Sequence, residues 1–142
     1  MTVRVRRARD EAEHAAAEAL VESVFGGEQG VPADAIERPV PRAVRLAALA
    51  DGGELVGTCR VVLDGGVARL GSLVVAAPAR RRGVATALVA AAEREARGDG
   101  ARIMRLHAQI DARPLYDAAG YAPVGAPFRE QGIDHLTMEK IL

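Results

Sequence analysis

The sequence has few residues of several types, and each shortage narrows the possible classes of protein. A single cysteine, Cys59, permits no internal disulfide, which agrees with a reducing compartment. We expect Cys59 to fill the core. Aromatic residues make up 3% of the chain and the formal net charge is zero. Nucleic-acid binding, which needs stacking groups or a wide basic stripe, therefore ranks last among the functions considered.

Long hydrophobic runs are also absent. No apolar stretch approaches the roughly 20 residues that a membrane-spanning helix needs. The segment from Met1 to Asp10 alternates arginine with small apolar residues and lacks the apolar stretch of a signal peptide. We therefore expect a cytoplasmic protein. No group of residues has the spacing of a metal site, so we expect no metal.

The composition that remains is that of one globular domain covering residues 1–142. Apolar residues make up 49% and charged residues 27% of the 142-residue chain, which is long enough to bury one core. Hydrophobic periodicity and turn residues predict strands at 2–7, 44–50, 54–63, 67–76, 102–108 and 136–141, and helices at about 11–25 and 81–97.

Several residues mark the expected boundaries of these elements. Asp10 is suited to cap the first helix, whose apolar face we assign to Ala16, Leu20, Val21, Val24 and Phe25. Asp111 is expected to cap a short helix that carries Pro114 in its first turn and stops at Gly120. Residues 26–42 follow no period and read as an irregular loop. Glycine pairs in the turns indicate antiparallel neighbours, so we predict an α/β (or α+β) sheet with helices on its faces.

Three consecutive arginines, Arg80, Arg81 and Arg82, stand at the predicted start of the second long helix. The helix dipole already places positive potential there and favours acidic residues. A bound phosphate would relieve the repulsion, and Gly83 would let it approach the backbone N–H groups. The alternative is a basic helix start that is simply solvated.

This segment resembles the acetyl-CoA signature of the GNAT acetyltransferases, R/Q-x-x-G-x-G/A, matched by Arg80, Gly83 and Ala85. It is neither a P-loop nor a Rossmann fingerprint, because the ending GK[ST] and the further glycines are missing. Stretches similar to the ElaA/YjcF-like branch of the family are EQGVP at 28–32, LHAQ at 106–109, LYDAAGY at 115–121 and FREQGIDHLTMEK at 128–140. The chain departs from the branch at two positions, where Leu115 and Tyr121 replace the usual phenylalanine. Both side chains remain largely apolar.

The resemblance implies a single GNAT-like domain, with a twisted, mixed but mostly antiparallel sheet and helices on both faces. It also implies acetyl-CoA as co-substrate, held around a splayed strand and the following helix start. The residues implied for cofactor binding are Leu73, Val74, Val75, Arg80, Arg81, Arg82, Gly83, Val84, Ala85 and Thr86. A backbone N–H of Leu73 or Val75 would polarise the thioester carbonyl.

The resemblance further implies that Tyr116 is the general acid to the leaving sulfur, whereas a place in the core or at its rim is its structural alternative. Family members often place a glutamate near the splayed strand, where this chain has Arg69 and Ser72. Glu28 is the leading candidate to deprotonate or bind the acceptor, or else it forms an ion pair that closes the loop. Candidates for substrate contacts are Gln109, His107 and His135.

The expected activity is acetyl transfer to an amine of an unidentified small molecule or peptide by direct attack. The alternative is a domain that binds acetyl-CoA or CoA as a sensor without turning it over. The absence of the glutamate that family members often have near the splayed strand supports this alternative. We expect no nucleic acid and no membrane among the partners. An exposed edge strand would be compatible with a homodimer.

Overall fold

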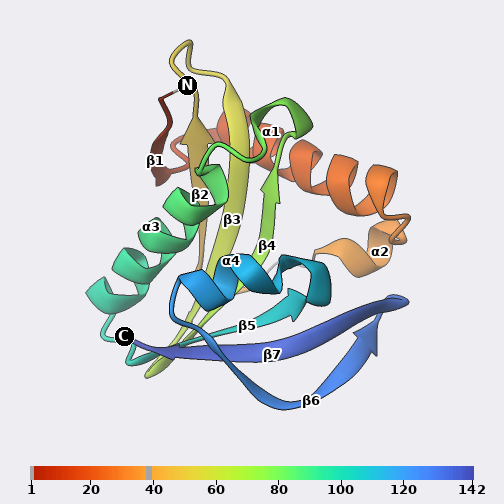
Figure 1. Cartoon of the computed structure of the whole chain (residues 1–142). Helices are drawn as coiled ribbons and strands as arrows, with labels where there is room; N and C mark the ends of the chain where they lie inside the picture. The colour runs from red at the N-terminus through yellow and green to blue at the C-terminus, as the bar shows by residue number, and fades with distance from the viewer. Residues whose placement is uncertain (1, 38–39) are drawn as a thin grey trace.

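The computed structural model describes residues 2–37 and 40–142, so positions 38 and 39 of the predicted loop lie outside the described residues. Its centre is a seven-stranded sheet in the order β1-β2-β3-β4-β5-β7-β6 (Figure 1). The strands are β1 (Arg4–Arg7), β2 (Ala43–Leu49), β3 (Leu55–Asp64), β4 (Val67–Val75), β5 (Ile103–Gln109), β6 (Ala122–Glu130) and β7 (Ile133–Ile141). The β4–β5 pair is parallel and the other five pairs are antiparallel, which confirms the predicted mixed sheet.

Helices cover both faces of this sheet (Figure 1). One face carries α1 (Glu11–Glu22), continued by a π-helical segment (Ser23–Glu28), and α2 (Ala33–Ile36). The other face carries α3 (Val84–Gly98) and α4 (Arg113–Ala118). Short 3₁₀ turns, Ala77–Ala79 and Ile110–Ala112, precede α3 and α4. None of the described helices is long and apolar enough to cross a membrane.

The main core lies between the sheet and α3. The predicted apolar stripe of this helix is confirmed, with Val84, Leu88, Val89, Ala92 and Ala96 all buried. They pack in one cluster with sheet residues such as Leu46, Val61, Met104 and Met138. Cys59 is fully buried in the same cluster, as expected, and burial raises the pKa of its thiol to about 12.

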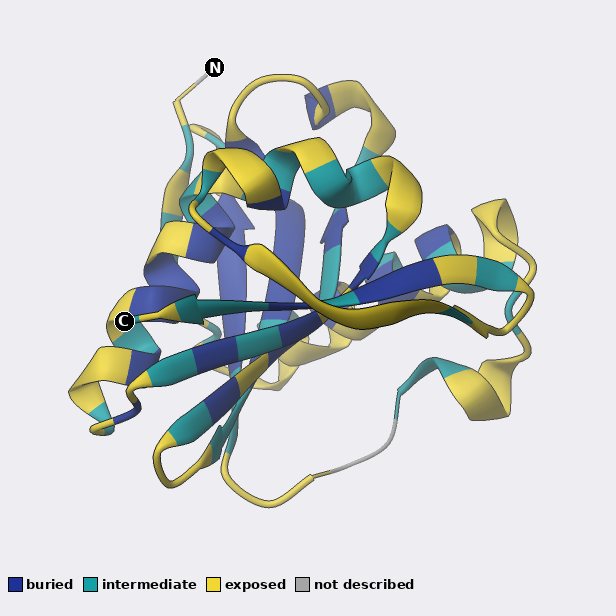
Figure 2. Ribbon diagram, turned by 60° about the horizontal axis from the view of Figure 1, so that its bottom comes forward, coloured by how far each residue is buried: buried dark blue, intermediate teal, exposed yellow. Residues whose placement is uncertain are grey.

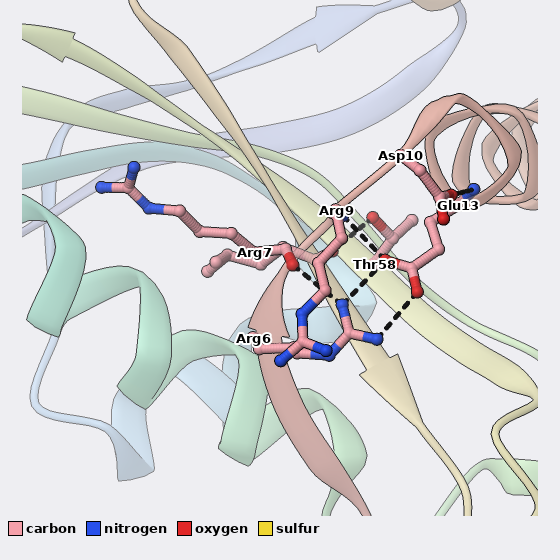
Figure 3. A network of polar contacts seen from close by, with 7 residues as sticks. Arg6, Arg7, Arg9, Asp10, Glu13 and Thr58 are labelled. Carbon is pink, nitrogen blue, oxygen red and sulfur yellow. Dashed lines mark hydrogen bonds and ion pairs between the residues drawn. The ribbon is translucent and has the colours of Figure 1, made fainter.

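The first helix is tied to the edge strand by a polar network (Figure 3). Asp10 caps α1 as predicted, because its carboxylate accepts a hydrogen bond of 2.9 Å from the Glu13 N–H. Arg6 of β1 donates two hydrogen bonds of 2.7 Å to the two carboxylate oxygens of Glu13. The Arg9 N–H donates a further one of 2.8 Å to that carboxylate. The Arg6 and Arg9 donors lower the pKa of Glu13 to about 2.

Several predictions about local structure were wrong. Residues 26–42, expected to form an irregular loop, contain the end of the π-helical segment (Ser23–Glu28) and the short helix α2 (Ala33–Ile36). Ala16 is exposed and Ala17 is buried instead, because the stripe on α1 runs through Ala17, Val21 and Val24, at i, i+4 and i+7. Asp111 lies inside the 3₁₀ turn, and Ala112 takes the N-cap of α4 without a side-chain bond.

Further errors are a missed strand, the start of its partner strand and the start of α3. The edge strand β6 is exposed along almost all of its length (Figure 2). Its two prolines and one glycine also interrupt any alternation, so it has no hydrophobic period. The partner strand β7 starts at Ile133 rather than at Leu136. The helix α3 begins at Val84, because Arg81 and Gly83 have positive φ angles of 62° and 83° and form a turn before it.

Candidate functional site

The site is built where the two parallel strands separate. The paired residues of β4 and β5 run from Val67 and Ile103 to Leu70 and Leu106, and the register ends there. Directly after this point β4 has a bulge, in which Ser72 and Leu73 lie opposite the single residue Cys59 of β3. Ser72 has a positive φ of 49°. The bulge bends β4 away from β5 and leaves backbone groups of β4 without a neighbouring strand on that side.

A cavity of about 500 Å³ occupies this region. Its walls include residues 69–75 of β4 and the β5 residues Arg105, Leu106, His107 and Gln109. Tyr116 of α4 and the segment that follows α1 complete the wall. The volume lies in the usual range of small-molecule and cofactor pockets.

A backbone donor of β4 points toward the gap. The Ala76 N–H donates to the Val56 carbonyl of β3 over 2.8 Å. Because successive N–H groups of a strand point to opposite edges, the Val75 N–H points away from β3, toward the gap. Leu73 lies in the bulge, where this regular alternation is interrupted. Of the two alternative donors implied by the sequence, the Val75 N–H therefore faces the gap, and both residues line the cavity.

The turn between β4 and α3 leads from this cavity to a helix start. Gly83 is the N-cap residue of α3, with no side chain to occupy the first N–H groups of the helix. Arg81 and Arg82 are exposed beside it. These free donors, the helix dipole and two exposed guanidinium groups together can bind an anion such as a pyrophosphate.

The side chain of Arg80 is directed elsewhere. Its Nε donates to the Val75 carbonyl over 2.9 Å, and its Nη2 donates to both carboxylate oxygens of Glu28, each over 2.9 Å. Next to this pair, the side-chain amides of Gln29 and Gln109 exchange two hydrogen bonds of 3.2 and 2.9 Å. The π-helical segment is thus joined to the pre-α3 turn and to the end of β5, along one wall of the cavity.

Tyr116 reaches the cavity from the opposite side of the sheet. Its side chain is buried, which raises the pKa of the phenol above its ordinary value, with a smaller contribution from Cys59. The ring packs edge-to-face against Tyr121 at 5.9 Å. Tyr121 is itself fixed by a 2.9 Å hydrogen bond from its hydroxyl to the buried Glu93, which also binds Lys140. Tyr116 is therefore a positioned, protonated phenol at neutral pH.

Two histidines line the far part of the cavity. His107 Nδ1 lies 3.2 Å from Glu130 Oε2, and its ring packs edge-to-face against Phe128. His135 is buried, is stacked on the same Phe128 ring, and lies with its Nδ1 2.7 Å from the Ile133 carbonyl. The β6–β7 hairpin thus holds both rings in place.

The structure brings most of the predicted site residues together. Nine of them line the cavity: Glu28, Leu73, Val74, Val75, Arg80, His107, Gln109, Tyr116 and His135. The remaining six, Arg81, Arg82, Gly83, Val84, Ala85 and Thr86, lie in the adjoining turn and first turn of α3. The Val84 side chain is buried in the core, so it offers the site its backbone alone.

Sequence reasoning assigned several cavity residues to no role in the site, among them the polar residues Gln29, Arg105 and Glu130. Gln29 lies within the EQGVP stretch, and Arg105 lies on the same face of β5 as His107 and Gln109. Both residues could therefore have been assigned to the site from the sequence. Glu130 lies within the FREQGIDHLTMEK stretch, but on the strand that was not predicted. Among the described residues, no group of three or more histidine, cysteine or acidic side chains could hold a metal ion.

Comparison with known proteins agrees with this geometry. Residues 10–142 match the model of the acetyltransferase (GNAT) domain family. The uncharacterized N-acetyltransferase YjcF of Bacillus subtilis (strain 168) is 32% identical over 120 residues, which cover 84% of this chain and 86% of YjcF. Two other proteins of that strain are 32% identical over 85 residues, and the match spans 58% and 57% of their lengths.

Solved structures have the same fold. A Lactobacillus plantarum protein assigned as an N-acetyltransferase superposes with a TM-score of 0.89, at 25% identity, over 100% of this chain and 99% of its own. Escherichia coli ElaA superposes with a TM-score of 0.83, at 20% identity, over 98% of both chains.

The family match, the splayed strands and the open helix start together define an acyltransferase that uses an acyl-CoA co-substrate. The chain belongs to the GNAT acetyltransferase family and is ElaA/YjcF-like within it.

Proposed function

We propose that this chain transfers the acetyl group of acetyl-CoA to an amine of a small molecule or peptide by direct attack. The observation that carries the proposal is the cavity at the separation of β4 and β5, which Tyr116 lines together with the Leu73–Val75 backbone. Acetyl-CoA supplies an activated thioester. All further steps are assigned to residues of this chain.

The turn before α3 binds the nucleotide end of the co-substrate. Backbone N–H groups from Arg81 to Thr86 bind the pyrophosphate, and the exposed Arg81 and Arg82 add positive charge. The positive φ of Gly83 keeps this turn close to the phosphates without a side chain in the way. Backbone groups of Leu73, Val74 and Val75 bind the pantetheine arm in the gap.

The Leu73 or Val75 N–H donates to the thioester carbonyl oxygen and stabilises the negative charge that develops there. A fixed donor of this kind typically lowers a barrier by roughly 3 kcal/mol. The amine nitrogen bonds to the acetyl carbon, the carbon–sulfur bond breaks, and the amine gives up one proton. The products are the amide and CoA.

Tyr116 protonates the departing sulfur. The Tyr116 hydroxyl is protonated at neutral pH, as a general acid requires, while burial, which raises its pKa, makes it a weaker acid than an exposed tyrosine. Glu28, beside the cavity, binds the acceptor ammonium group or removes its proton. Gln109, His107 and His135 contact the acceptor from the β5 and β7 side.

The test is CoA release from acetyl-CoA, followed with a thiol reagent, in the presence of a broad panel of amines. The expected result is acceptor-dependent release, with one acetyl group gained by the amine in the mass spectrum. Binding of acetyl-CoA without release for any amine would instead support the sensor function. Absence of acetyl-CoA binding would overturn both.

A further inference from the structure

Arg69 and Arg105 lie side by side on the wall of the acyl-transfer cavity. They are direct partners in the parallel register of β4 and β5. Their sequence neighbours Ala68, Leu70, Met104 and Leu106 are buried in the core on the α3 side. Because side chains alternate between the faces of a sheet, both arginines project from the opposite face, where both line the cavity.

Two like charges on neighbouring strands repel each other unless something compensates them. Glu139, the β7 partner of Arg105, accepts a 2.5 Å hydrogen bond from Arg105 Nε. Arg69 lies 3.7 Å from Asp64, and the two side chains are 54% and 72% exposed. Such an exposed contact contributes little. The Arg69 guanidinium is therefore only weakly compensated, and it lies beside a second cation, Arg105.

The acidic residues that line the cavity have partners other than Arg69 and Arg105. Glu28 is bound by Arg80, and Glu130 lies beside His107. Gly71 and Ser72 line the cavity between Arg69 and the Leu73 N–H, so the cationic region and the acyl-transfer region share one space. Two like charges that face each other on neighbouring strands break the usual pairing rule, and such local exceptions often mark functional sites.

We propose that the acceptor is an amine that also carries a carboxylate, of the amino-acid class, and that Arg69 and Arg105 bind its carboxylate. Guanidinium groups bind planar carboxylates with paired hydrogen bonds, which lysine does not match. The carboxylate takes no part in the reaction: it orients the amine, whose nitrogen gains the acetyl group and loses a proton. This inference rests on the proposed acetyl transfer.

The experiment compares matched acceptors: phenylalanine with 2-phenylethylamine, leucine with isoamylamine, and tyrosine with tyramine. Rates of CoA release are corrected for the fraction of neutral amine. Wild type is expected to have a kcat/KM at least about tenfold higher for the amino acid of each pair. A tenfold difference is about 1.4 kcal/mol of binding to the transition state.

The variants are Arg69→Gln, Arg105→Gln and the charge reversal Arg69→Glu. The first two are expected to raise KM for the amino acid about tenfold with little change in kcat, and Arg69→Glu to reverse the preference. Because Arg105→Gln deprives Glu139 of its partner, the double variant Arg105→Gln/Glu139→Gln is measured beside it. Arg94→Gln, on the exposed side of α3, is the matched control and is expected to behave as wild type.

Binding of N-acetylphenylalanine to the CoA-saturated protein, measured by calorimetry, separates the two proposals. Transfer with equal or better rates for the decarboxylated amines would overturn the inference and leave acetyl transfer intact. No transfer to any amine, with N-acetylphenylalanine binding that Arg69→Gln weakens, would retain the carboxylate site and overturn the activity. No transfer and no binding would overturn both.

Discussion

Arg80 holds Glu28 through two hydrogen bonds of 2.9 Å from a single nitrogen, Nη2. The same arginine binds the Val75 carbonyl, so it connects the loop after α1 to the strand that carries the proposed oxyanion donor. The Arg80 side chain therefore holds Glu28 in place at the wall of the cavity.

The two roles of Glu28 predict different effects of changing each partner. If the carboxylate removes a proton from the acceptor, Glu28→Gln lowers kcat by about 10²-fold or more. Arg80→Gln, the other residue that the signature allows, keeps the carboxylate and has a much smaller effect. Steady-state kinetics of both variants with one acceptor measure this difference. Equal losses in both variants would assign Glu28 to loop closure instead.

The turn before α3 predicts a binding defect for Gly83→Ala. With φ at +83°, alanine there costs about 1–2 kcal/mol of backbone strain, and a shift of the turn displaces the N–H groups proposed to bind phosphate. We expect a roughly tenfold higher Kd for acetyl-CoA, equivalent to about 1.4 kcal/mol.

Gly100→Ala is the matched control for this variant. Gly100 follows the other end of α3, has φ at +86°, and like Gly83 has open space around the position of a Cβ. It should lose similar stability in urea unfolding and keep the wild-type Kd. An equal loss of acetyl-CoA binding in both variants would show that strain alone is responsible.

The network around Glu13 predicts a pH-dependent contribution to stability (Figure 3). The folded pKa of about 2 lies below the ordinary value of 4.5, so the unfolded chain binds the proton more tightly. The contribution is therefore fully present above about pH 4.5 and is lost as the pH falls toward 2. Glu13→Gln should unfold at a lower urea concentration than wild type at pH 7, and the gap should narrow steadily below pH 4.5. A gap that is independent of pH would contradict this assignment.

The sequence predicts well those elements whose burial follows a simple period or whose ends carry a clear signal. Asp10 and the stripe Val84, Leu88 and Ala92 are examples, because a cap and a one-sided helix are local properties. The strand Ala122–Glu130 was not predictable in this way, because its residues are mostly exposed and its pairing with β7 is set by tertiary contacts.

The site was predictable where a backbone motif defines it, as at Gly83, and less so where side chains meet across the fold. The meeting of Gln29 with Gln109 joins residues 80 positions apart. The juxtaposition of Arg69 and Arg105 depends on the parallel register of β4 and β5. No local pattern contains such information.

The most direct test of the account is Tyr116→Phe, because phenylalanine keeps the edge-to-face packing on Tyr121 and removes only the hydroxyl. One measurement combines kcat for CoA release with the calorimetric Kd for acetyl-CoA. The account predicts a Kd within about twofold of wild type and a kcat lower by about 10²–10⁴-fold. An unchanged kcat, or a loss of acetyl-CoA binding that accounts for the whole defect, would contradict the role of Tyr116 as the acid of the acetyl transfer.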